Sequence, residues 1–450
     1  MGNAPDASPS RGYAVLNAAK LLQPGMHVKR WILLIVVGLV TTSLGFAYIL
    51  THIYRVQPLP EVASFVTLQF IDRLVRGLLF LLVGLPCFVF GLLKLNQSLL
   101  AAFVGTGNRS VVDAIYSYRF RQRGPKIVVI GGGTGLSVAL RGLKAYTSNL
   151  TAIVTVADDG GSSGRLRRDM GVLPPGDFRN CMVALADVEP LMENLFQYRF
   201  NHGSELEGHS FGNLFIVAMS EVTGNFERAL EESSRVLAVR GQVLPSTLAD
   251  VTLCAEMDDA LRVQGESSIS ACGQRIRRVY LEPGDALAYP ASIKAIMEAD
   301  LVVVGPGSLY TSVLPNLMVH GIGRALSETS ATKIYVCNVA TQPGETDGYG
   351  ISDHIDALLR HLGNRRNPFD VVLANSRLGL PMPPSGKVLP VPPEEDRRGE
   401  GPGPRLVLAE VVDEHNAVRH DSTRLAQAIM KIYEESSERA RSWAKIGQFV

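Results

Sequence analysis

The sequence predicts an α/β fold built on a doubly wound, mostly parallel sheet, preceded by an N-terminal hairpin of two transmembrane helices. Three observations predict it. Two apolar runs lie in the N-terminal part, short β-branched runs alternate with helical patterns from about residue 124, and glycine-rich turns follow several of those runs. Such alternation is typical of a parallel sheet with helices on both faces. With 450 residues, the chain has room for roughly two or three structural units.

Composition excludes several classes of protein. Lys and Arg total 44 against 43 Asp and Glu, so the formal charge of +1 gives no reason to expect a nucleic-acid partner. Apolar residues make up 46% of the chain, which excludes collagen and global disorder. The five cysteines are scattered, without a CxxC pair, and are interpreted as reduced thiols in a cytosolic compartment.

The two apolar runs predict the membrane hairpin. Trp31 to Leu50 carries no charge and has the length that a helix rising ~1.5 Å per residue needs to cross a ~30 Å hydrocarbon layer. Gly77 to Leu93 is shorter and contains Pro86, so a buried or interfacial helix is the alternative there. Basic residues before the first run and after the second place both ends in the cytoplasm. We therefore expect a multi-pass protein of the cell membrane whose soluble domain is cytoplasmic.

These runs also divide the chain. Neither run contains an acidic residue or a histidine, which favours an anchor over a transport path. Short alternating strands predict an inserted β unit in the soluble part, and a proline-rich stretch predicts a mobile loop there. The expected segments are an N-terminal cytoplasmic segment (1–30), the hairpin (31–94), a linker (95–123) and a ligand-binding α/β domain (124–450) with the β unit at about 241–283 and the mobile loop at 377–404.

The first structural unit of the soluble part is a βαβ unit. Residues 126–130 form an apolar strand, 131–135 a glycine turn, 136–143 the start of a helix and 151–156 the next strand. Glycines let the backbone approach a phosphate closely, and the first turn of the following helix offers free N–H donors. We therefore predict a phosphate site at this turn. Tight packing of helix on strand is the alternative, because the glycines do not fit GxGxxG.

Two adjacent carboxylates, Asp158 and Asp159, follow the second strand. In a dinucleotide-binding fold an acidic side chain at this place accepts hydrogen bonds from ribose hydroxyls. The pair could instead hold Mg²⁺ together with substrate phosphates. Asx turns within the glycine-rich loop are a third interpretation, which explains less of the surrounding cluster of Ser162, Ser163 and Arg165.

Further along the chain, Asp177 and Arg179 stand where a helix begins. Asp177 is either the N-cap of that helix or a ligand-binding residue. A cation in a first helical turn is disfavoured by the helix dipole unless an anion lies nearby, so Arg179 favours an anionic ligand. His209 precedes another helix, where a lone histidine is more often a capping or packing residue, and it is retained as a candidate.

Two more strands, residues 300–304 and 333–338, end in polar loops. Because ligands of open α/β sheets bind at the carboxyl ends of the strands, three such loops predict one shared cleft. Residues 405–411 predict a returning strand, and residues 423–443 a closing helix. We find no GxSxG, HExxH, Walker A or zinc-binding pattern.

Six ordered motifs carry a resemblance to a known family. They are IGGGTGLS (130–137), VTVADDGGSSGRLR (154–167), LPPGDFRN (173–180), HSFGNL (209–214), GPGSLYTS (305–312) and CNVATQPGETDGY (337–349). Together they resemble the YvcK-type gluconeogenesis factors, which belong to the superfamily of 2-phospho-L-lactate transferase. The stretch from Pro24 to Trp31 resembles the longer, membrane-anchored form, and LPPGDFRN favours the factor branch over the transferase branch.

The resemblance implies a Rossmann-like fold that binds a nucleotide-containing ligand, either a UDP-sugar such as UDP-N-acetylglucosamine or an NAD-like dinucleotide. It also implies a link to growth on gluconeogenic carbon sources and to cell shape. The predicted ligand-binding residues are Gly131, Gly132, Gly133, Thr134, Gly135, Asp158, Asp159, Ser162, Ser163, Arg165, Asp177, Arg179, Asn180, His209, Asn213, Gly305, Gly307, Ser308, Tyr310, Thr311, Asn338 and Thr341.

Two functional hypotheses follow. The first is a nucleotide-sugar-binding regulator, tethered to the membrane, that controls carbon flux into the cell envelope through an unidentified protein partner, since the sequence shows no nucleophile–base pair. The second is a transferase of phosphorus-containing groups, with Mg²⁺ held by Asp158 or Asp159. We expect no nucleic-acid partner under either hypothesis, and a homo-oligomer is compatible with both.

Overall fold

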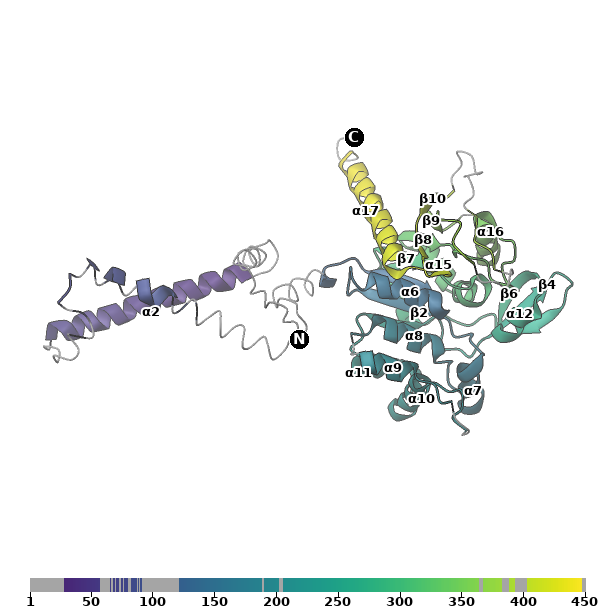
Figure 1. Cartoon of the computed structure of the whole chain (residues 1–450), viewed down its shortest axis with the longest axis horizontal. Helices are drawn as coiled ribbons and strands as arrows, with labels where there is room; N and C mark the ends of the chain where they lie inside the picture. Colours follow the sequence, from purple (N-terminus) through teal and green to yellow (C-terminus); the bar gives the residue numbers. More distant parts are fainter. Residues whose placement is uncertain are drawn as a thin grey trace, which may run out of the picture. The chain divides into compact units, whose positions relative to one another are not determined.

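The computed structural model describes residues 28–56, parts of 65–90, and 121–446 apart from 188–189, 202–204, 364–366, 383–387 and 393–402. The chain divides into two compact units, residues 1–120 and 121–450 (Figure 1). The predicted N-terminal segment and most of the predicted linker lie outside the described residues.

The N-terminal unit contains one long helix, α2 (Val28–Val56), and the first apolar run lies within it. The hydroxyls of Thr41 and Thr51 donate to the carbonyls of Val37 and Ala47, at 3.0 and 2.7 Å. Among the described residues, no helix combines the length and the hydropathy that crossing a bilayer requires. The predicted transmembrane hairpin is therefore not supported. Part of the second apolar run lies outside the described residues, and the membrane localisation stays a prediction.

A seven-stranded sheet forms the centre of the second unit, and every pairing in it is parallel. This confirms the predicted α/β class and fits a Rossmann-like fold. The strand order is β10-β9-β8-β7-β1-β2-β3. The strands are β1 (Ile127–Gly131), β2 (Leu150–Val154), β3 (Gln242–Pro245), β7 (Leu301–Val304), β8 (Thr332–Val336), β9 (Val371–Asn375) and β10 (Arg405–Ala409).

The central strands are continuous apolar runs because both faces of the sheet are covered. β1 and β7 are buried along their whole length, and Ile127 of β1 lies in register with Leu150 and Leu301. Figure 1 shows α9, α10 and α11 gathered beyond α8 at one end of this unit. The helices are α6 (Gly133–Leu143), α7 (Gly161–Met170), α8 (Gly176–Leu185), α9 (Pro190–Gln197), α10 (Phe211–Thr223), α11 (Phe226–Val236), α12 (Glu266–Cys272), α13 (Pro290–Met297), α14 (Leu314–Met318), α15 (Ile322–Glu328), α16 (Ile351–Leu362) and α17 (Ser422–Ile446), with a π-helical turn η1 at Leu309–Val313.

A separate antiparallel sheet lies in the region predicted as an inserted β unit. It has the order β5-β4-β6, formed by β4 (Thr252–Met257), β5 (Arg262–Gln264) and β6 (Ile276–Glu282), with α12 between β5 and β6. The predicted range began too early, because β3 pairs with β2 in the large sheet. A short hairpin of β11 (Val412–Asp413) and β12 (Asn416–His420) precedes α17. Most of the loop predicted at 377–404 lies outside the described residues.

The strand order reverses direction between β1 and β7. From β1 the chain winds outward through β2 to β3, whereas from β7 it winds the other way through β8 and β9 to β10. The loops after β1 and β7 therefore leave the sheet in opposite directions and open a crevice at its carboxyl edge, where ligands of such sheets bind. The fold thus selects the glycine turn and the loop after β7 as the first place to look for a site.

The contact between α6 and α17 provides a test of this packing. A Cβ atom on Gly142 of α6 would lie 2.0 Å from the carbonyl oxygen of Ser422, at the start of α17. Gly142→Ala should therefore push the two helices apart and destabilise the unit by about 1–3 kcal/mol. Gly284→Ala is the matched control, because its Cβ would meet only the Leu281 carbonyl oxygen, at 3.5 Å. Urea unfolding of the two variants should separate them, and equal midpoints would contradict the packing.

Candidate ligand-binding site

Two glycine-containing loops meet at the crevice, the turn after β1 and the loop after β7. A Cβ on Gly135 would lie 2.5 Å from the Pro306 carbonyl oxygen, so the two backbones touch where a side chain has no room. Gly133, with a φ of 63°, starts α6. The amide of Asn316, in α14, donates to the carbonyl oxygen of Gly131 at 2.9 Å and fixes the end of β1.

A cavity of about 300 Å³ lies beneath these loops. The first turn of α6 forms one wall. Gly132, which caps α6, has no side chain to bond the N–H donors of that turn, and the Gly133 N–H among them donates to Asp177. The hydroxyl-bearing side chain of Thr134 is exposed there. The lining residues are Gly132, Gly133, Thr134, Gly135, Val138, Pro306, Gly307, Ser308, Ser312, Asn338, Val339, Ala340, Thr341, Gln342, Pro343, Val388, Val418, Arg419 and His420.

Arg419 and His420 reach the cavity from the β11–β12 hairpin and were not predicted. Arg419 is exposed and makes no ion pair with a described residue. His420 is buried with Nε2 3.3 Å from the Cys337 carbonyl oxygen, and burial lowers its pKa to about 4, so the ring is neutral at pH 7. The sequence signal was weak, because neither residue follows a glycine-rich turn.

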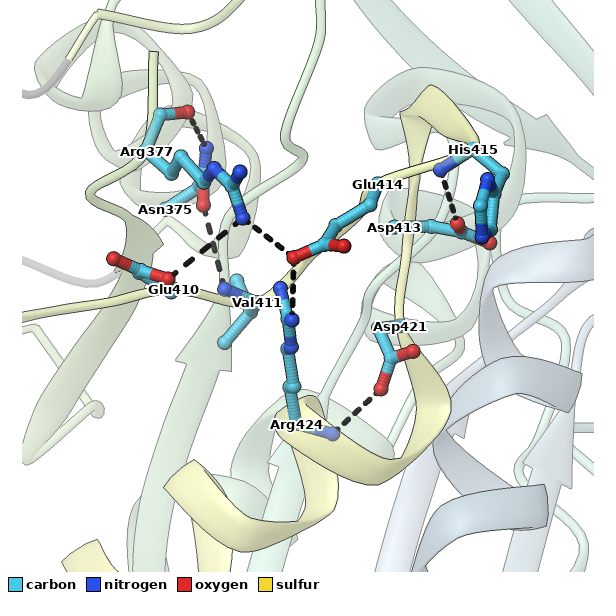
Figure 2. A network of polar contacts seen from close by, with 9 residues as sticks. All are labelled: Asn375, Arg377, Glu410, Val411, Asp413, Glu414, His415, Asp421 and Arg424. Carbon is cyan, nitrogen blue, oxygen red and sulfur yellow. Dashed lines mark hydrogen bonds and ion pairs between the residues drawn. The ribbon is translucent and has the colours of Figure 1, made fainter. Parts of the chain in front are cut away.

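An ion-pair network supports this hairpin (Figure 2). Glu414, in the hairpin turn, accepts hydrogen bonds from Arg377 at 2.7 Å and from Arg424 at 2.6 Å. Arg424 and Arg377 together lower the pKa of Glu414 to about 2. Asp421 accepts from the backbone N–H of Arg424 at 2.7 Å and caps α17. The network joins the end of β9, the hairpin and α17, and so sets the place of Arg419.

The loops after β7 and β8 are bonded to each other through residues that the sequence predicted as ligand-binding. Asn338 accepts from the Gly307 N–H at 3.2 Å and donates to its carbonyl oxygen at 2.9 Å. Gln342 donates to the Ser308 hydroxyl at 2.6 Å, and Thr341 accepts from the Leu389 N–H at 3.0 Å. These side chains line the cavity, and their hydrogen bonds also fix the conformation of the loops that form its wall.

Tyr310 and Thr311 lie behind that wall. The hydroxyl of Tyr310 is buried 2.8 Å from that of Tyr349, and burial raises its pKa. Thr311 donates to a carboxyl oxygen of Glu345 at 3.1 Å. Both residues therefore support the loops, and Gly305, whose φ is 80°, begins the turn that they hold.

The carboxylates Asp158 and Asp159 point to different partners. Asp158 accepts from the Gly160 N–H at 2.9 Å, and burial raises its pKa. Asp159 accepts from both the N–H and the hydroxyl of Ser267, in α12, at 2.9 and 2.7 Å. The described residues contain no group of three or more His, Cys, Asp or Glu side chains arranged to hold a metal ion. Because the Asp159 carboxylate is engaged by Ser267, Asp158 is the better candidate of the two for binding a ligand.

Asp177 stands in the first turn of α8 but accepts from another helix, namely from the Gly133 N–H of α6 at 2.7 Å. A Cβ on Gly132 would lie 2.7 Å from its carboxyl oxygen. Burial raises the pKa of Asp177 to about 6, and the nearby charge of Asp158 acts in the same direction. Asp177 therefore does not cap its own helix. Its carboxylate fixes the turn between β1 and α6, which lines the cavity.

Buried polar side chains connect α7, α8 and α10 beside these carboxylates. The Ser162 hydroxyl lies 3.0 Å from His209 Nδ1 and accepts from the Asn213 amide at 3.1 Å. Burial lowers the pKa of His209. Because all three side chains are buried, the geometry makes them a link between helices rather than an exposed nucleophile–base pair. Ser163 is buried against Gly176, where a Cβ would lie 2.4 Å from its hydroxyl oxygen.

Arg179 is a buried cation in the same region. It donates to the side chains of Ser210 and, at 2.8 Å, Asn180, and burial lowers its pKa to about 10. Its Nε atom has no hydrogen-bond partner among the described residues. Arg165 instead donates to the Glu207 carbonyl oxygen at 2.6 Å. Arg179 is the more deeply buried of the two arginines, and its Nε is a buried donor without a partner among the described residues.

The parallel sheet, the reversal of strand order and the glycine turn above a cavity define a Rossmann-like α/β protein. Residues 127–382, more than half of the chain, match the family model described as 2-phospho-L-lactate transferase CofD. The chain belongs to this family, which confirms the resemblance seen in the motifs.

Relatives extend the comparison. A protein of Nostoc sp. is 47% identical over 425 residues, which cover 92% of each chain. The protein named gluconeogenesis factor of Bacillus subtilis is 47% identical over 327 residues, covering 69% of this chain and 99% of the relative. A crystal structure of a Bacillus halodurans protein has a TM-score of 0.64 at 47% identity, covering 68% of this chain and all of that one.

The raised pKa of Asp177 predicts how stability depends on pH. The folded state holds the proton up to about pH 6, whereas an ordinary aspartate releases it near 3.8, so stability falls as the pH rises between these values. Asp177→Asn keeps an acceptor for Gly133 without the buried charge. It should remove this fall and raise stability at pH 7 by up to about 3 kcal/mol.

Urea unfolding between pH 4 and pH 7 measures the effect of Asp177→Asn. Asp169→Asn is the control, because Asp169 is exposed on α7. The same pH dependence in the wild type and Asp177→Asn would contradict the burial of this carboxylate.

Proposed function

We propose that this protein is a nucleotide-sugar-binding regulator that links central carbon metabolism to cell-envelope synthesis and cell shape. Its ligand is a UDP-sugar such as UDP-N-acetylglucosamine, with an NAD-like dinucleotide as the alternative ligand. The observation that carries the proposal is the cavity at the β1–β7 crevice, where the first turn of α6 and Arg419, which makes no ion pair with a described residue, face one space. The names of the relatives support the metabolic role.

The chemistry of the cavity suits a diphosphate. N–H groups at a helix N-terminus, together with the helix dipole, favour an anion. The guanidinium of Arg419 adds charge-assisted hydrogen bonds, which are the stronger kind. Thr134 and the glycine backbone supply further donors without the bulk of side chains.

The size of the cavity indicates how the ligand lies. About 300 Å³ is at the small end of the range for ligand pockets, so it holds the phosphates and one neighbouring group. Gly132 lines the cavity and also lies against the Asp177 carboxylate. Asp177, and Asp158 near it, are therefore next to the cavity. Ribose and sugar hydroxyls are donors that suit such acceptors.

A regulator has to transmit binding to a protein partner, and the loops around the cavity connect to other elements. Asp159 is bonded to α12 of the antiparallel unit, and the hairpin that carries Arg419 is held by the network on α17. Changes in either loop on binding would therefore reach the surface of the unit. We infer a protein partner that recognises the ligand-bound form.

The second candidate is a Mg²⁺-dependent transferase of phosphorus-containing groups, which the family match favours. Asp158 would hold the metal, because the Asp159 carboxylate is engaged by Ser267. Incubation of the protein with the bound nucleotide and Mg²⁺, followed by product analysis, distinguishes the two candidates. Ligand recovered intact supports the regulator, and ligand consumed supports the transferase.

Arg419→Ala tests the cavity. Loss of its charge-assisted hydrogen bonds should weaken binding of UDP-N-acetylglucosamine by about 10–100-fold, which corresponds to about 1.4–3 kcal/mol. Arg235→Ala, on α11, is the matched control because that arginine is exposed and pairs with Glu231 and Glu232. Isothermal titration of the full-length variants measures both. Unchanged affinity in Arg419→Ala would remove this cavity from the proposal.

A further inference from the structure

Helix α12, from the antiparallel unit, is bonded to two of the polar loops of the site. Near its start, Ser267 donates from both its N–H and its hydroxyl to Asp159, in the loop after β2. One turn later, the hydroxyl of Ser270 donates to Glu345, in the loop after β8, at 3.1 Å. The antiparallel unit is thus anchored to loops that belong to different halves of the large sheet.

The first residue of α12 is Glu266, which sequence analysis did not select. Its carboxyl group is largely removed from solvent, and Oε2 is buried without a hydrogen-bond partner among the described residues. The carboxylates that act on its charge include Asp158 and Asp159 after β2, Asp177 in α8 and Glu345 after β8. Burial, together with repulsion from these carboxylates, raises the pKa of Glu266 to about 9.

Two other groups around the same carboxylates also retain unused hydrogen-bonding capacity. Arg179, which is 5% exposed and lies near Asp177 and Asp158, has an unpaired Nε. Glu345, which is 6% exposed, has an unpaired Oε2. Buried polar atoms are nearly always paired in folded proteins, so unpaired donors and acceptors in one region indicate a polar ligand.

A protonated carboxyl group has a property that its ionised neighbours lack. It carries one O–H donor, whereas Asp158 and Asp177 in their ionised form only accept hydrogen bonds. An anionic ligand that approaches this side of the site meets repulsion from the aspartates. A neutral acid at Glu266 reduces that repulsion and supplies a donor.

We propose that Glu266 binds the ligand directly, as a hydrogen-bond donor to an anionic ligand oxygen, supplied to the site by the antiparallel unit. This inference rests on the proposed function, because the ligand is the anionic nucleotide derivative assigned there. It adds a specificity determinant from outside the large sheet. It also gives α12 a direct contact with the ligand, between its two anchors at Asp159 and Glu345.

The test is isothermal titration of the full-length protein with UDP-N-acetylglucosamine and, separately, with inorganic diphosphate, between about pH 7 and pH 10. Wild-type affinity should be constant near pH 7. Above about pH 9 it should fall by up to tenfold for each pH unit, as Glu266 ionises. Glu266→Gln keeps a donor of the same shape, so its affinity at pH 7 should stay within about threefold and should lack that fall. Glu266→Ala should bind about 10–30-fold more weakly near pH 7.

Glu282→Gln is the matched control, because Glu282 is an exposed glutamate of the same unit. It should retain the wild-type affinity and pH profile. Identical profiles in the wild type and Glu266→Gln would overturn the role of Glu266. Binding of diphosphate alone, with the expected profiles, would support Glu266 and overturn the nucleotide-sugar assignment. Binding of neither probe by the wild type would overturn both.

Discussion

The approach of two backbones at the β1–β7 crevice is the constraint on which the rest of the site depends. The turn after β1 comes so close to the loop after β7 that a Cβ on Gly135 would meet the Pro306 carbonyl oxygen at 2.5 Å. The two loops follow neighbouring strands at the point where the strand order reverses, and the missing Cβ of Gly135 leaves room for their contact. The first turn of α6, the cavity and the carboxylate of Asp177 beside Gly132 all lie at this contact.

Much of the fold was predictable because its signals are local. The strands of the βαβ unit and the strand before Gly305 are apolar runs, two of which lead into a glycine turn, and each was predicted within two residues of its observed bounds. The N-terminal hairpin rested on the same kind of local signal, apolar length, and the structure does not support it. The length of an apolar run is enough to separate a strand from a turn. It is not enough to decide whether a long helix crosses a membrane.

The candidate site was only partly predictable, because several of its contacts join residues far apart in sequence. Asp177 was expected to cap its own helix or bind a ligand, yet it accepts from Gly133, in a different helix. Arg419 lies in a hairpin and Glu266 in helix α12 of the antiparallel unit, and the local sequence patterns of these elements do not indicate a cavity. Such residues become candidates only when the tertiary structure brings their elements to the carboxyl edge of the large sheet.

The electrostatics of the site divide it into two ends with opposite preferences. The α6 turn and Arg419 favour negative charge, whereas Asp158 and Asp177, with raised pKa values, mark a place where negative charge is already costly. A ligand that is anionic at one end and rich in hydroxyl groups at the other satisfies both ends. Under the proposed function, a molecule that carries both groups meets both ends of the site. At the acidic end, Glu266 as a neutral acid is then the donor for an anionic oxygen, while the aspartates accept from hydroxyl groups.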